Sequence, residues 1–158
     1  MVVSLLNISC KKEHDIKKSK ITVANVLTLS LKKKCKKDTF TVAFYNIENC
    51  FDFEYDGTEY PEYIPGKSSW TQEMQLIKIN AMSEVISALN ADILGICEIE
   101  DEDALFDLRD GLKAAKSPYR YYAIGMGDIR SVTSTALLSR FHVKNIRSSH
   151  TPDQTGPG

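Results

Sequence analysis

The chain has 158 residues, of which 42% are hydrophobic and 26% charged, a composition that allows one folded domain with a core and leaves little room for two. Its net charge of −1 averages two unlike parts: residues 1–38 hold ten lysines and three acidic residues, a net of +7, and residues 39–158 carry −8. An acidic domain does not favour tight nonspecific binding of nucleic acid, which needs a basic face. The four cysteines form no Cys-x-x-Cys pair and have no nearby histidine at zinc spacing, which argues against a structural zinc site. We therefore predict a basic leader, residues 1–38, joined to one domain over residues 39–158.

Two apolar stretches in the leader bear on where the protein is located. Val2–Cys10 has no positive charge before it and loosely resembles the end of a lipoprotein signal, although Asn7 stands where an aliphatic residue is expected. The alternative is a disordered basic tail. Residues 21–31 are too few to span a bilayer, which takes about twenty residues, and suit a short helix or an interfacial anchor. The sequence leaves the location open between a cytoplasmic protein and, if translation begins upstream of Met1, an exported lipoprotein. The leader is the candidate for a membrane tether.

From Thr39 onward the sequence predicts a strand, a long loop, a helix and a second strand. Phe40–Tyr45 is rich in aromatic and β-branched residues, typical of a buried strand, and residues 46–69 are polar and interrupted by glycines and prolines, typical of a loop. Trp70–Asn90 has the three-and-four apolar spacing of an amphipathic helix, and Ile93–Ile99 is a second apolar strand. This order favours parallel strands joined by a right-handed crossover, so that both strands end at the same edge of the sheet.

The first helix is expected to begin with Ser69 and Gln72 as a capping pair. Cys97, inside the second strand, is expected to be a small buried hydrophobe. A second helix is predicted over Asp101–Leu112, followed by shorter strands over residues 119–124, 135–139 and 143–147. The apolar face of the first helix is predicted to consist of Met74, Ile77, Ala81, Val85, Ile86 and Leu89.

Acidic residues cluster in the long loop and at the start of the second helix. We interpret those in the loop as a solvated surface, and Trp70 at its end as a packing residue. We interpret residues 100–103 as the negative first turn of the helix, favoured by the helix dipole, and not as additional ligands. The acidic loop residues are Asp52, Glu54, Asp56, Glu59 and Glu62.

Polar side chains stand where each of the two predicted buried strands ends: Asn46 after the first and Glu98 in the second. Because ligands in α/β proteins gather at the carboxyl ends of strands, these residues predict one shared site for a metal ion or a phosphate. Glu98 supplies a carboxylate suited to a hard cation such as Mg²⁺, and Asn46 can orient a neighbour or a water. The simpler alternatives are a turn-forming asparagine and a strand-end carboxylate satisfied by backbone or solvent.

Four segments, in order, resemble the endonuclease/exonuclease/phosphatase superfamily: residues 42–49, the loop with Trp70, residues 91–100 and residues 136–140. The resemblance covers residues 39–150 and implies an α/β fold, a four-layer α/β sandwich of the deoxyribonuclease-I type. We expect this chain to hold a partial, truncated form of it, the N-terminal part. The resemblance implies hydrolysis of a phosphoester, with a phosphodiester preferred, and Mg²⁺ or Mn²⁺ as cofactor. It leaves nucleic acid, an inositol phosphate and a phospholipid head group open as substrates.

The same resemblance implies roles for individual residues. Asn46 matches a catalytic asparagine that organises the metal and the attacking water, and Glu98 matches the family's metal-binding glutamate. Glu48 stands where an acidic or polar side chain often lies beside the metal. Asp128-Ile129-Arg130 resembles an Asp-x-Arg-Gly element whose arginine approaches the substrate phosphate, although Ser131 replaces the glycine.

Three further motifs of the superfamily are absent from the sequence: Asn-x-His, Gly-Asp-x-Asn and a terminal Ser-Asp-His. We expect neither His142 nor His150 to take their place, and place His142 at the start of a strand. A second hypothesis is therefore a catalytically inert, truncated fragment that binds a metal weakly. A third is an unrelated, non-enzymatic small α/β binding module, which would be supported if the strands with Asn46 and Glu98 did not pair.

Overall fold

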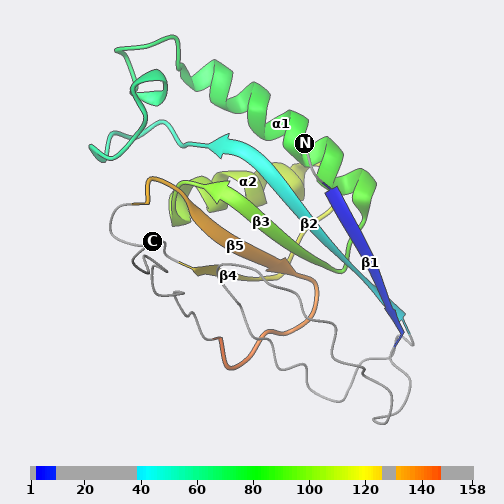
Figure 1. Cartoon of the computed structure of the whole chain (residues 1–158). Helices are drawn as coiled ribbons and strands as arrows, with labels where there is room; N and C mark the ends of the chain where they lie inside the picture. Colours follow the sequence, from blue (N-terminus) through cyan, green and yellow to red (C-terminus); the bar gives the residue numbers. More distant parts are fainter. Residues whose placement is uncertain (1–2, 10–38, 126–130, 147–158) are drawn as a thin grey trace, which may run out of the picture.

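The computed structural model of the chain describes the backbone of residues 3–9 and all of residues 39–125 and 131–146. Their strands form one sheet in the order β1-β2-β3-β5-β4 (Figure 1). The central pair, β2 and β3, is parallel, and the other three pairs are antiparallel. The strands are β1 (Val3–Ser9), β2 (Thr39–Cys50), β3 (Ile93–Ile99), β4 (Tyr121–Gly125) and β5 (Ser134–Ser139).

The strand β1 lies at one edge of this sheet, paired with β2. It falls within the part of the sequence expected to be a leader, whose boundary near Asp38 and role in localisation stay predictions. The helices over the described residues are each too short or too polar to span a bilayer.

The two α-helices lie close to where the apolar spacing predicts them. Helix α1 (Gln72–Leu89) connects β2 to β3, and helix α2 (Glu102–Ala114) follows β3. A short 3₁₀ turn, η1 (Pro61–Tyr63), lies in the loop before α1. The predicted capping pair is wrong: the N-cap of α1 is Thr71, whose side chain accepts a hydrogen bond from the Met74 amide at 3.2 Å.

Two strand predictions need correction. Strand β2 continues to Cys50, five residues beyond the predicted end, because the chain passes through an irregularity and pairs again with β3. Residues 143–146 form no strand, and position 147 lies outside the described residues.

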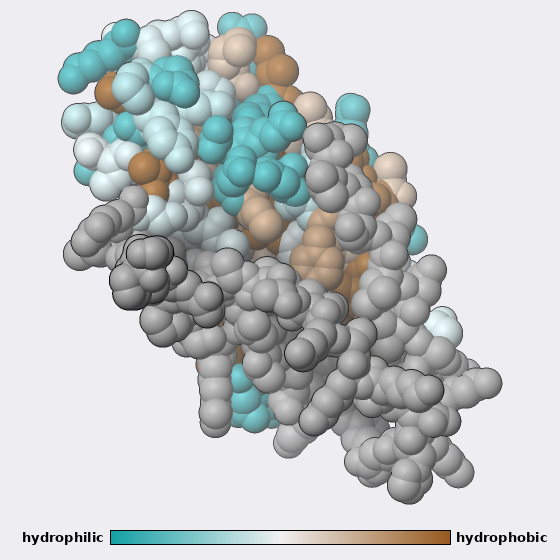
Figure 2. All heavy atoms as spheres, viewed as in Figure 1, coloured by the Kyte–Doolittle hydropathy of each residue, from teal (hydrophilic) through white to brown (hydrophobic). Residues whose placement is uncertain are grey.

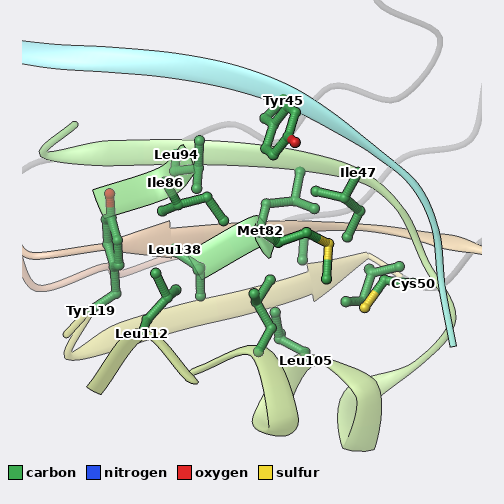
Figure 3. Packing of buried hydrophobic residues seen from close by; sticks show 14 of the residues in the cluster. Tyr45, Ile47, Cys50, Met82, Ile86, Leu94, Leu105, Leu112, Tyr119 and Leu138 are labelled. Carbon is green, nitrogen blue, oxygen red and sulfur yellow. The ribbon is translucent and has the colours of Figure 1, made fainter. Parts of the chain in front are cut away.

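Both helices pack on one face of the sheet, and the main core lies between them and the strands (Figure 3). The helices approach each other closely at Gly111 of α2. A Cβ atom there would lie 2.6 Å from Ile79 Cγ2 and 2.7 Å from Ser83 Oγ, closer than packed atoms tolerate. Gln75 of α1 also donates a hydrogen bond to Asp107 of α2 at 2.5 Å. The glycine therefore sets how near the two helices lie.

The predicted apolar face of α1 is partly wrong. Met74 and Ile77 are 47% and 56% exposed, whereas the polar Gln75 and Ser83 are buried. The helix carries apolar residues on more than one side, so periodicity alone did not select the face. The contacts with α2 select it, because they accept a polar side chain at Gln75 and place the helix against Gly111.

The opposite face of the sheet carries a smaller cluster around Ile93, Ala123 and Leu137. Phe44 on this face is 45% exposed. Cys97 lies at the end of the paired stretch of β3 and is exposed, so its predicted burial is wrong, whereas Cys50 is buried. A mixed sheet with helices packed on one face confirms the predicted α/β class, as part of a sandwich.

Candidate metal and phosphate site

The parallel ladder of β2 and β3 becomes irregular where both strands end. The register runs from Val42 opposite Ile93 to Asn46 opposite Cys97 and then shifts, so that Cys50 lies opposite Ile99. Within this irregular stretch three residues other than glycine have left-handed backbones: Glu48, Asn49 and Glu98, with φ of 54°, 61° and 66°. Such conformations are uncommon and cluster at functional sites. Here they redirect side chains away from the regular alternation of a strand.

Asn46 and Glu98 meet across this irregular stretch. Asn46 Nδ2 donates a hydrogen bond to Glu98 Oε1 at 2.7 Å. The amide oxygen of Asn46 accepts a hydrogen bond from the backbone N–H of Glu48 at 2.8 Å, which fixes the direction in which the amide faces. Within residues 39–125 and 131–146, no hydrogen bond is formed to Glu98 Oε2. The predicted convergence of Asn46 and Glu98 is thus present, while Glu48 contributes its backbone to the pair.

A pocket of about 370 Å³ opens beside the pair, with Glu98 in its lining. One side comes from the end of β2 and the loop that follows it, and the other from Thr133, immediately before β5. Figure 2 shows hydrophilic residues gathered over the part of this face where β2 and β3 end. Sequence reasoning did not identify Tyr60 or Thr133, because only the tertiary structure brings the loop and β5 to Glu98. The lining residues are Asn49, Tyr60, Glu62, Glu98 and Thr133.

A second acidic group lies at the start of α2. Asp52, Asp101 and Asp103 each place one carboxylate oxygen within 4.8 Å of the others. Asp101 is the N-cap of α2 and accepts a hydrogen bond from the Ala104 amide at 2.9 Å, which agrees with the predicted helix start. The interpretation of Asp52 as a solvated residue is wrong, because it is only 6% exposed.

Glu100 lies buried against this acidic group. Its Oε2 accepts a hydrogen bond from the Asp52 amide at 3.0 Å, and among the described residues its buried Oε1 has no partner. Burial, with a smaller contribution from the charges of Asp52 and Asp101, raises the pKa of Glu100 to about 8. Burial likewise raises the pKa of Asp52 to about 6. Burial and the neighbouring charges thus favour the protonated form of Glu100.

Glu98 and the acidic group around Asp52 suit a hard cation in different ways. Mg²⁺ binds through one or two carboxylates and keeps several waters, a pattern that Glu98 beside a pocket can satisfy. The three carboxylates of Asp52, Asp101 and Asp103 offer more charge, but Asp52 is buried and none of the three lines the pocket beside Glu98.

Four other residues of interest in the sequence either lie outside the described residues or have contacts with residues other than Asn46 and Glu98. Arg130 and His150 lie outside the described residues. His142 is exposed, and its ring lies edge-on to Tyr121 with centroids 5.0 Å apart. Trp70 is buried as predicted and donates from Nε1 to the Asp52 carbonyl at 2.9 Å.

Comparison with protein families identifies the fold to which these elements belong. Residues 41–156, nearly three quarters of the chain, match the Endonuclease/Exonuclease/phosphatase family. The chain belongs to this family. The endonuclease/exonuclease/phosphatase family acts on phosphoesters and is generally dependent on a divalent metal. No curated protein and no solved structure matched the chain. The family match and the parallel pairing of β2 with β3 both argue against an unrelated binding module.

Proposed function

We propose that Asn46 and Glu98 form the metal-binding part of a phosphodiesterase site that uses Mg²⁺ or Mn²⁺. The hydrogen bond from Asn46 Nδ2 to Glu98 Oε1 is the observation that carries this proposal. It holds one carboxylate oxygen and leaves Oε2 without a hydrogen bond from the described residues, beside the pocket. A carboxylate held in this way is pre-organised to bind a cation.

The chain's own residues would divide the work as follows. When bound, a divalent cation would neutralise the charge that develops on the phosphoryl oxygens. Glu98 binds that cation, and Asn46 orients both the glutamate and the attacking water. Glu48 stands at the same strand end and is the second candidate ligand. Arg130, shortly before the pocket residue Thr133 in the sequence, is our candidate for contact with the substrate phosphate.

The pocket also bears on the choice of substrate. Its lining includes two carboxylates, Glu62 and Glu98, and the ring of Tyr60. Such a pocket repels a polyanion in the absence of a cation, so we do not expect tight nonspecific binding of nucleic acid. Nucleic acid, an inositol phosphate and a phospholipid head group all remain candidate substrates with a metal bound.

Titration of the full chain with Mn²⁺, followed by electron paramagnetic resonance of the free ion, tests the ligand assignment. Glu98→Gln should weaken binding at least about tenfold, because it replaces the charged ligand with a neutral one. The matched control is Glu84→Gln, an exposed glutamate on α1. If Asp103→Asn weakens binding and Glu98→Gln does not, the cation binds at the acidic group around Asp52, and our assignment is wrong.

Hydrolysis of a chromogenic phosphodiester such as bis(4-nitrophenyl) phosphate separates catalysis from metal binding alone. Mg²⁺-dependent turnover by the purified chain, lost in Glu98→Gln, would support a catalytic site. Intact Mn²⁺ binding without any turnover would support the alternative hypothesis, a chain that binds a metal but is catalytically inert.

A further inference from the structure

The backbone of Glu48 is held from the side by helix α1. Lys78 Nζ, on the second turn of α1, donates a hydrogen bond to the Glu48 carbonyl oxygen. Glu48 and Asn49 both have left-handed backbones at the point where β2 leaves its ladder with β3. Two successive residues other than glycine keep this conformation only when surrounding contacts hold them. The Lys78 ammonium is one such contact, and it comes from a different element.

Glu48 connects Lys78 to Glu98, the proposed metal ligand, through Asn46. The Glu48 carbonyl accepts from Lys78, while the Glu48 N–H donates to Asn46 Oδ1 at 2.8 Å. The two groups lie in successive peptide planes that meet at the Glu48 Cα, so while Glu48 keeps its left-handed backbone, with φ of 54°, restraining the carbonyl also restrains the direction of the N–H. That N–H makes Asn46 present its Nδ2 to Glu98 Oε1, at 2.7 Å. With the amide reversed, an oxygen would face the carboxylate and the hydrogen bond would be lost.

We propose that Lys78 is a positioning residue, which sets the orientation of the Asn46–Glu98 pair through the backbone of Glu48. This inference rests on the proposed function only where it concerns the metal. The orientation of Asn46 in the metal-free protein is a separate consequence and can be measured without any ligand.

The sign of the effect on metal binding distinguishes positioning from charge. The Lys78 ammonium lies at this strand end, because it donates to the Glu48 carbonyl oxygen. On charge alone, removing a cation from this neighbourhood would tighten the binding of a second cation. Loss of positioning has the opposite result, because Glu98 would no longer be held in place.

The experiment compares Lys78→Met with Lys113→Met in the full chain. Both substitutions remove one positive charge, and Lys113 is an exposed residue near the end of α2. We expect Lys78→Met to weaken Mn²⁺ binding about tenfold, the usual effect of losing an outer support of a metal ligand, and Lys113→Met to leave it within about twofold. Lys78→Arg, which keeps a cationic donor, should restore most of the affinity. If Glu98→Gln weakens Mn²⁺ binding and Lys78→Met leaves it equal or tighter, the proposal is overturned.

A metal-free measurement keeps the test independent of the proposed function. The side-chain amide signals of Asn46 in a ¹⁵N-labelled sample, assigned by their loss in Asn46→Ser, should shift in Lys78→Met and remain in place in Lys113→Met. If Lys78→Met fails to fold, Lys78→Gln serves for the same comparison. Unshifted Asn46 signals would refute the role of Lys78. Shifted signals together with unchanged Mn²⁺ binding by Glu98→Gln would instead refute the metal site and leave the role of Lys78 intact.

Discussion

Asn46 and Glu98 are separated by 52 positions in the sequence and joined by a hydrogen bond of 2.7 Å. The bond links an amide nitrogen at the end of the regular β2 ladder to a carboxylate on a left-handed residue of β3. Because the donor belongs to a neutral side chain, Glu98 keeps its charge available for a cation. The pair is therefore the first place to test.

Replacing the neutral donor with a second carboxylate should make stability depend on a cation. In Asn46→Asp a carboxyl oxygen would face Glu98 Oε1. Two carboxyl groups so close share a proton unless a cation lies between them. We expect the free energy of unfolding at pH 7 to fall by about 1–2 kcal/mol and to recover in Mn²⁺. Urea unfolding with and without Mn²⁺ measures this. The control is Asn80→Asp, at an exposed position of α1; an equal loss there would contradict the explanation.

Stability should fall with rising pH because of Glu100. Its pKa is raised from an ordinary 4.5 to about 8 in the folded chain, mainly by burial. The folded state then binds more protons than the unfolded state between those values, so the contribution to stability is complete below about pH 4.5 and is lost as the pH rises through about 8. Glu100→Gln, which stays neutral, should flatten this dependence. Urea unfolding at several pH values would show it, and an unchanged slope in the variant would contradict the assignment.

Gly111 should tolerate no larger side chain. A Cβ atom there would lie 2.6 Å from Ile79 and 2.7 Å from Ser83, so α1 and α2 would have to separate. We expect Gly111→Ala to destabilise the protein by about 1–3 kcal/mol, the usual effect of overpacking, although alanine is the better helix former. Thermal unfolding measures the change. The control Asp110→Ala, at the exposed neighbouring position, should stay within about 0.5 kcal/mol of the wild type.

The two described cysteines should differ in reactivity. Cys97 is exposed, whereas Cys50 is buried and its pKa is raised to about 12, chiefly by burial. Because the thiolate is the reactive form, iodoacetamide at pH 8 should modify Cys97 in the native chain and reach Cys50 only in denaturant. Peptide mapping by mass spectrometry distinguishes the two sites. Modification of Cys50 at the same rate as Cys97 under native conditions would show that the core around it opens easily.

Local sequence was enough to predict the β2–α1–β3 unit and, through it, the meeting of Asn46 and Glu98. Apolar spacing marked both strands and the helix between them, and a helical crossover between neighbouring strands makes them parallel, so both end at one edge. The roles of Asn46, Glu48 and Glu98 in binding a metal stay predictions, as does that of Arg130.

Other features depended on contacts between distant segments and could not be read from spacing. Asp52 is buried because its amide donates to Glu100 and its carbonyl accepts from Trp70, and neither partner is near it in the sequence. The buried face of α1 includes Gln75 because Asp107 of α2 accepts its hydrogen bond. The sequence by itself thus determined the β2–α1–β3 unit and helix α2, and which side chains stand at the two strand ends. The tertiary structure alone decided how those side chains are oriented, because their partners come from other elements and a hydrogen bond depends on direction as well as distance.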